Sequence, residues 1–222
     1  DCVPFTTNME TLIDECRKMP PVDTPKLFKR IWRGSMPGIV SGLYTDRNMY
    51  YSSYLSTYVE RDVRDISGTV DALKFNRFIT AVAARTSQLL NYNALAEDAE
   101  IDIQTSKAWI NILETLGIIF LLHPYSNNVL KRTIKTPKVY FYDTGLVCYL
   151  TKWSSPEVAE SGAMSGALLE NFTVSEIVKG YQNAGLEPYL YFYRDRDAKE
   201  IDVIMEGDGK LCPLEIKKTA MP

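Results

Sequence analysis

The spacing of apolar and polar positions predicts a chain that is mainly helical in its N-terminal part. Apolar residues recur every three or four positions in closely spaced segments, which is typical of amphipathic helices. These segments are residues 72–90, 93–99 and 102–116. Asp102 or Thr105 is expected to cap the third helix and Gly117 to end it. Residues 48–66 show a further helical pattern with a stripe of tyrosines, which favours packing against neighbouring helices.

Strand-like patterns begin after the third helix. Residues 118–123 and 138–143 predict two strands separated by a polar loop. Three helices followed by a two-stranded wing is the element order of a winged helix-turn-helix. Residues 153–166 resemble a linker, and residues 167–181 predict another helix. Three strands are expected after it, over residues 189–194, 200–206 and 210–218. The predicted fold class is therefore α+β.

These patterns divide the chain into three segments. Residues 1–48 predict a lead-in of short helices joined by proline-rich turns. Residues 49–152 hold a linker helix and the winged helix-turn-helix. Residues 153–222 form a small α/β unit.

Composition narrows the function classes without naming one. The chain has 222 residues, 45% of them hydrophobic, and a net charge of −3, so a polyanion could bind only at a local patch. Four scattered cysteines and one histidine argue against a zinc site and a disulfide framework, and favour a reducing, cytoplasmic compartment. No apolar run is long enough to predict a membrane span.

A local basic patch is present in the predicted wing. Lys131, Arg132, Lys135 and Lys138 lie in or beside its loop, and Lys107 lies on the third helix of the winged unit. These cations could neutralise DNA phosphates while the helix enters the major groove. Winged helices also serve as protein-binding modules, so both DNA binding and protein binding by this unit remain possible interpretations.

The last two predicted strands carry the candidate chemistry. Asp208-Gly209 favours a tight hairpin turn, and the resulting register places Asp202 opposite Glu215 and Glu200 opposite Lys217. Like charges across a strand pair repel unless a cation lies between them. Magnesium binds carboxylate oxygens of this kind.

A third carboxylate, Glu170, lies at one end of the apolar stripe of the predicted helix 167–181 and could reach the same cation. The chemistry would be metal-assisted phosphodiester hydrolysis, in which Lys217 orients water or offsets developing charge. The alternative is a strand whose charged side chains are merely solvated.

The pattern of Asp202, Glu215 and Lys217 after a helix bearing Glu170 resembles the PD-(D/E)xK nuclease superfamily. A closer similarity is to the C-terminal region of a prokaryotic family of AAA+ superfamily ATPases whose C-terminal domain is called DUF4143. The stretches that carry it are "YLSTYVERDVRDI", "KTPKVYFYDTGL", "LLENFTVSEIVK", "YFYRDRDAKEIDVI" and "PLEIKK".

This resemblance implies roles for the three segments. Residues 1–48 would be the tail of an ATPase module, residues 49–152 a winged-helix part, and residues 153–222 a nuclease-like domain truncated at its C-terminus. Its catalytic residues would be Glu170, Asp202, Glu215 and Lys217, the three acids holding Mg²⁺. The expected partners are DNA and the chain's own ATPase module. ATP would bind only to that module, because this chain has no G-x-x-x-x-G-K-[ST] loop.

Two alternatives belong to other function classes. One is a non-catalytic module that recognises DNA or protein through a degenerate nuclease fold. The other is a homo-oligomer formed through the aromatic stripe from Tyr51 to Tyr58.

Overall fold

Most of the described helices begin where a short polar side chain caps the first turn. In a computed structural model, which describes residues 8–18, 20, 23–59, 61, 63, 71–125, 136–194, 199–207 and 210–218, Asp102 Oδ1 accepts a hydrogen bond from the Thr105 N–H at 2.9 Å. Asp102 is therefore the cap of the third predicted helix. Equivalent caps begin other helices at Asp23, Asp46, Asp71 and Asn91.

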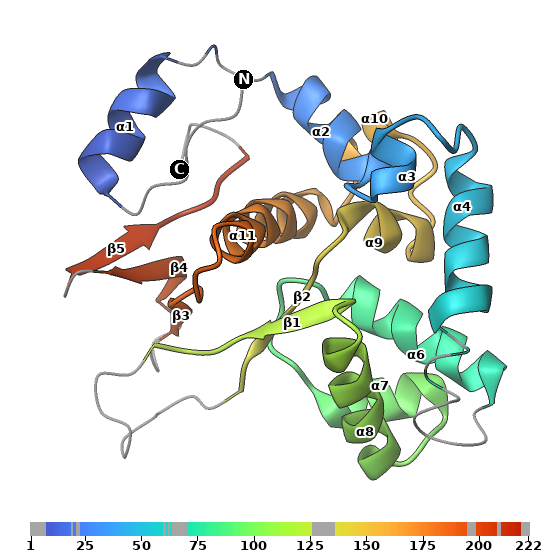
Figure 1. Cartoon of the computed structure of the whole chain (residues 1–222). Helices are drawn as coiled ribbons and strands as arrows, with labels where there is room; N and C mark the ends of the chain where they lie inside the picture. The colour runs from blue at the N-terminus through green and yellow to red at the C-terminus, as the bar shows by residue number, and fades with distance from the viewer. Residues whose placement is uncertain are drawn as a thin grey trace.

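The chain is a mixture of helices and two small antiparallel sheets, which confirms the α+β class (Figure 1). The helices are α1 (Met9–Lys18), α2 (Thr24–Arg33), α3 (Pro37–Val40), α4 (Arg47–Tyr54), α6 (Ala72–Ala84), α7 (Tyr92–Ala99), α8 (Ile103–Thr115), α9 (Thr144–Leu150), α10 (Pro156–Ser161) and α11 (Ser165–Asn183). The strands are β1 (Ile119–Leu122), β2 (Lys138–Phe141), β3 (Leu190–Arg194), β4 (Glu200–Gly207) and β5 (Lys210–Leu214). A π-helical turn, η1 (Leu55–Val59), continues α4. None of the described helices is long and apolar enough to cross a membrane.

The helices α6, α7 and α8 are followed by the antiparallel pair β1–β2, in the order that the sequence predicts. Trp109 joins α8 to α6, because its ring meets Phe75 and Phe78 of α6 edge-on at centroid distances of 5.3 and 5.2 Å. The identity of this unit as a winged helix stays a prediction.

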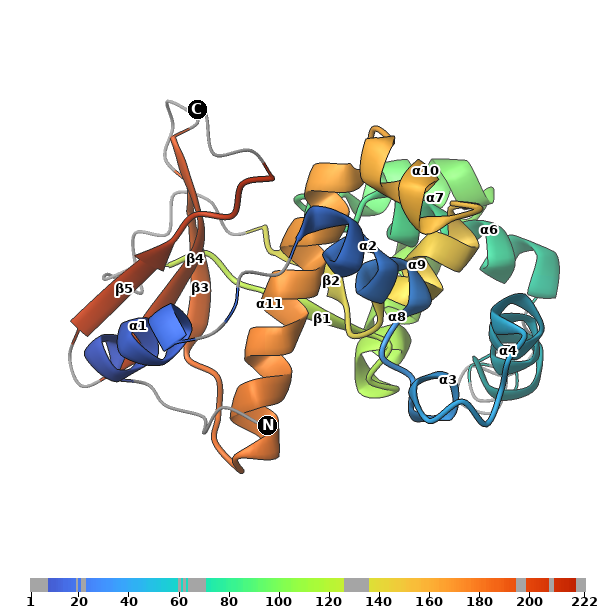
Figure 2. The ribbon, with the colours of Figure 1, turned by 90° about the horizontal axis from the view of Figure 1, so that it is seen from above.

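The second sheet has the strand order β3-β4-β5. The β4–β5 register pairs Val203 with Leu214 and Met205 with Cys212, as the hairpin pattern predicts, whereas the turn residues 208–209 lie outside the described part of the chain. The chain beyond β1 joins this sheet, since the Tyr125 N–H donates to the Phe192 carbonyl at 2.6 Å. Helix α11 lies between the sheet and the helices α2, α9 and α10 (Figures 1 and 2).

Two clusters of buried side chains form the core. The larger draws on α2, α4, α6, α8, α9 and the start of α11, so it takes side chains from all three predicted segments. The smaller lies between α11, β2 and the β3–β4–β5 sheet. Strand β2 separates them, because Val139 and Phe141 belong to the larger cluster and Tyr140 to the smaller one.

Two helices were not expected from the sequence. Helix α9 begins at Asp143, whose Oδ1 accepts from the Leu146 N–H at 2.7 Å. Helix α10 lies inside the predicted linker and begins at the Ser155 cap, with Pro156 in its first turn. Both carry recognisable start signals, an Asp or Ser before the first turn, and both are shorter than the windows in which apolar periodicity is visible.

Candidate functional site

The candidate site lies where helix α11 crosses strand β2. Asn171 fixes this crossing, because its side-chain amide donates to the Phe141 carbonyl at 2.8 Å and its Oδ1 accepts from the Phe141 N–H at 2.8 Å. Asn171 is fully buried, so these bonds are shielded from water. The adjacent residue, Glu170, is thereby held against the face of β2 that carries Lys138 and Tyr140.

Glu170 contacts both of those side chains. Its Oε1 accepts from the Lys138 Nζ at 2.9 Å and from the Tyr140 hydroxyl at 2.6 Å. The Lys138 ammonium also lies 2.5 Å from Glu200 Oε1, at the first residue of β4. We call Lys138, Tyr140, Glu170 and Glu200 the Lys138 cluster. It joins residues from α11, β2 and β4 that are far apart in the sequence.

The Lys138 cluster is largely buried, and Glu200, whose side chain is 28% exposed, forms its more open side. The Lys138 side chain is 4% exposed and that of Glu170 is 16% exposed. The Lys138 ammonium lies 5.6 Å from the centroid of the Phe192 ring, close enough for a cation–π contact. Arg194 of β3 lies 3.4 Å from Glu200 Oε2 at the outer edge of the cluster.

Burial and charge set the ionisation of the cluster. Burial alone lowers the pKa of Lys138, but the carboxylates of Glu170 and Glu200 outweigh it and hold this pKa above its ordinary value. Burial raises the pKa of Glu170, even though Lys138 and Tyr140 oppose it. The lysine is therefore a firmly charged ammonium, and Glu170 is protonated more easily than an exposed glutamate.

The other predicted acids lie beside the cluster or away from it. Asp202 is near enough to contribute to the raised pKa of Glu170, but its Oδ2 accepts from the Ile216 N–H at 2.8 Å. Strand β5 ends at Leu214, so Glu215 follows the last ladder pair. The Glu215 and Lys217 side chains are 49% and 56% exposed, and their charged atoms lie 3.7 Å apart.

The structure corrects the predicted partner of Glu200. The hairpin pattern places Glu200 opposite Lys217, whereas in the structure Glu200 pairs with Lys138 and Arg194. The reason is that β5 ends before Lys217 can join the ladder. Glu200 is left to pair with the buried lysine.

The three acids predicted to hold magnesium, Glu170, Asp202 and Glu215, do not gather into one group in the structure. No three of the described His, Cys, Asp and Glu side chains lie close enough together to hold one metal ion. Glu170 already accepts two hydrogen bonds at Oε1, and the Lys138 ammonium supplies the positive charge that a cation would bring. Glu215 lies on the surface.

The predicted DNA-binding residues have different outcomes. Lys131, Arg132 and Lys135 lie outside the described residues. Lys107 is exposed on α8, with its Nζ 5.9 Å from the centroid of the Tyr92 ring. Lys138 points into the Lys138 cluster and not toward the surface. The role of Lys138 was missed, although the alternation in "KVYF" places it on one face with Tyr140.

A second buried carboxylate, Asp143, links three helices. Besides capping α9, it accepts from the Tyr51 hydroxyl of α4 at 2.6 Å and from the Ser35 N–H after α2 at 2.6 Å. Burial and this carboxylate raise the pKa of Tyr51, which stays protonated as a donor. Four hydrogen bonds from described residues reach Asp143, and they connect the end of α2, α4 and the start of α9.

Comparison with known proteins supports part of the resemblance. Residues 165–222 match the model of DUF4143, a domain of unknown function, which confirms that part of the similarity. Uncharacterized proteins of Mycobacterium bovis (Mb2031c) and Mycobacterium tuberculosis (Rv2008c) are each 28% identical to this chain over 196 residues. The match covers 87% of this chain and 43% of each relative, so the chain spans less than half of their length. No solved structure gives a significant match. Residues 24–157, more than half of the chain, match the model of DUF8612, and the chain therefore belongs to this family of domains of unknown function.

Proposed function

We propose that this chain is a recognition module that engages nucleic acid without cutting it. The observation that carries the proposal is the position of Lys138, whose ammonium lies 2.9 Å from Glu170 and 2.5 Å from Glu200 in a largely buried site. This internal cation offsets the charges of Glu170 and Glu200, so these two carboxylates need no divalent metal between them. The nuclease-like unit then serves as a scaffold.

Nucleic-acid contact is assigned to the basic residues of the loop before β2 and to Lys107, as the winged-helix pattern predicts. A cluster of Lys and Arg that neutralises phosphates binds through counterion release, so its affinity falls steeply with salt. The same resemblance places the module in the C-terminal part of an AAA+-type ATPase. ATP would bind to a part of that protein outside this chain, which has no phosphate-binding loop.

The rival proposal is magnesium-dependent phosphodiester hydrolysis at Glu170, Asp202, Glu215 and Lys217. Its support is the proximity of Asp202 to Glu170, which helps to raise the pKa of Glu170. Against it, Asp202 Oδ2 and Glu170 Oε1 are already occupied by hydrogen bonds, and Glu215 is half exposed. We therefore assign no hydrolytic step to these residues.

The test measures binding and cleavage in parallel. Plasmid and single-stranded DNA are incubated with the protein in Mg²⁺ or Mn²⁺, and binding is followed at several salt concentrations. We expect binding that weakens as salt rises, a shallower salt dependence for Lys131→Gln with Arg132→Gln, and no cleavage. Metal-dependent cleavage by the wild type that is lost in Lys217→Ala would overturn the non-cleaving assignment. Failure to bind DNA at low salt would overturn the engagement of nucleic acid.

A further inference from the structure

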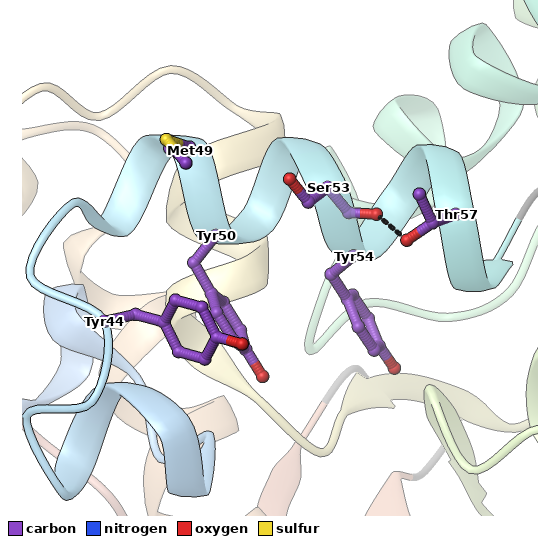
Figure 3. A pocket seen from close by; sticks show the side chains of 6 residues that line it. All are labelled: Tyr44, Met49, Tyr50, Ser53, Tyr54 and Thr57. Carbon is purple, nitrogen blue, oxygen red and sulfur yellow. Dashed lines mark hydrogen bonds between the residues drawn. The ribbon is translucent and has the colours of Figure 1, made fainter.

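Two parallel tyrosine rings project from one side of helix α4. Tyr50 and Tyr54 are one helical turn apart, their planes differ by 3° and their centroids lie 6.5 Å apart (Figure 3). Successive bases in duplex DNA lie about 3.4 Å apart, so a ring between two others needs about 7 Å. The spacing of the two tyrosines is therefore close to that of a slot for one flat ring.

The slot opens into a pocket of about 270 Å³. Besides Tyr50 and Tyr54, the pocket is lined by Tyr44, Met49, Ser53 and Thr57. Among the described residues that line it, none is charged, and five of the six carry a hydroxyl group. Such a lining favours an uncharged ring with a polar edge, because a purely apolar ring would cover hydroxyls without giving them partners.

One wall of the slot is fixed by packing. The Tyr50 ring meets the Tyr51 ring edge-on at a centroid distance of 5.5 Å, and the Tyr44 ring packs against it at 5.1 Å with the planes tilted by 56°. Tyr51 is fully buried and is held by its hydrogen bond to Asp143. The Tyr50 ring is therefore oriented before any ligand arrives, which lowers the cost of binding.

The other wall lies at an irregularity of the helix. The π-helical turn η1 begins directly after Tyr54, and the Thr57 hydroxyl donates to the Ser53 carbonyl across it (Figure 3). π-Helical turns are rare and occur often at functional sites. Tyr54 is therefore the last residue of the α-helical part, directly before the change to the π-helical turn.

We propose that Tyr50 and Tyr54 bind one nucleobase between their rings, with the hydroxyl of Tyr44 near its polar edge. The base comes either from a free nucleoside or from a single strand, and the chemistry of the slot is the same for both. This site lies on α4, far in sequence from the Lys138 cluster, and its occupancy does not depend on whether that cluster binds metal. The nucleoside binds even if the loop before β2 does not engage DNA.

The experiment uses 2-aminopurine, whose fluorescence is quenched when it stacks on an aromatic ring. The probes are 2-aminopurine riboside and an oligothymidine strand with one central 2-aminopurine. Tyr54→Ala and Tyr54→Leu remove the flat ring, and Tyr54→Phe keeps it. Tyr189→Ala is the matched control, because Tyr189 is 53% exposed and does not line the pocket. Circular dichroism of each variant verifies its fold, and the conservative Tyr54→Phe and Tyr54→Leu pair preserves the comparison if Tyr54→Ala does not fold.

We expect the wild type, Tyr54→Phe and Tyr189→Ala to quench the probe with similar affinity. Loss of one stacking ring weakens binding about 5- to 150-fold. Quenching of both probes supports a site for nucleosides, and quenching of the oligonucleotide alone supports a base presented by a strand. No quenching by the wild type, or equal quenching by Tyr54→Leu, overturns the proposal. A dimer in solution that is lost in Tyr54→Leu, without quenching, also overturns it in favour of contact between two copies of the chain.

Discussion

The buried Lys138 ammonium carries the positive charge that allows the carboxylates of Glu170 and Glu200 to lie close together on either side of it. Removing one partner from a buried ion pair leaves uncompensated charge and costs about 3–5 kcal/mol. Lys138→Met is therefore expected to lower the free energy of unfolding at neutral pH by about 3 kcal/mol, measured by urea denaturation. The matched control is Lys217→Met, because Lys217 is 56% exposed beside Glu215 and an exposed pair contributes about 0–1 kcal/mol.

The stability deficit of Lys138→Met should narrow toward both ends of the pH scale. Because the pKa of Lys138 is raised, its contribution is present below the ordinary lysine pKa of about 10.4 and is lost as pH rises through the higher folded value. Burial raises the pKa of Glu170, so in the variant this glutamate takes up a proton at pH values above the ordinary glutamate pKa of about 4.3. Protonation removes the unpaired negative charge that destabilises the variant. A difference in unfolding free energy between wild type and Lys138→Met that stays constant from about pH 5 to about pH 11 would contradict an ionised cluster.

At the scale of elements, the joint of α2 with α9 depends on a close approach of backbone. A Cβ on Gly145 would lie 2.7 Å from the Arg33 carbonyl oxygen and from the Gly34 Cα, and 2.2 Å from the Tyr51 hydroxyl. Backbone atoms cannot move aside, so Gly145→Ala should destabilise the protein by about 1–3 kcal/mol. Gly166→Ala is the control, because a Cβ there meets nothing within 4 Å. Thermal denaturation that ranks the two variants equally would contradict the close approach.

Local patterns predicted some elements of the site, and contacts distant in sequence made the rest unpredictable. The hairpin register followed from the Asp208-Gly209 turn signal between the two strands. The pairing of Glu200 with Lys138 could not follow, because no sequence pattern tells which face of β2 meets α11. The alternation of "KVYF" places Lys138 and Tyr140 together, but both faces of β2 are buried, so polarity does not distinguish them. Asp143 before "TGLVCYL" is a recognisable helix cap. The helix that follows it has only seven residues, which is too short for apolar periodicity to indicate a helix.

At the scale of the whole molecule, β2 and α11 join the two hydrophobic clusters. Helix α11 contributes Leu168 and Leu169 to the larger cluster and Val174 and Val178 to the smaller one. Strand β2 contributes alternate residues to each. Neither cluster can lose its packing without exposing an element that the other also needs, so we infer that the two clusters unfold together.

This inference predicts one unfolding transition even when a single cluster is damaged. Phe28 of α2 and Phe192 of β3 are both fully buried, the first in the larger cluster and the second in the smaller one. Phe28→Ala and Phe192→Ala should each lower the free energy of unfolding by about 3–5 kcal/mol. In both variants, far-ultraviolet circular dichroism and tyrosine and tryptophan fluorescence should report the same midpoint in urea. Trp32, Trp109 and Trp153 pack in or against the larger cluster, so tryptophan fluorescence reports on that cluster. If Phe192→Ala shows two midpoints and the tryptophan signal changes only at the higher one, the β3–β4–β5 sheet is a separate cooperative unit.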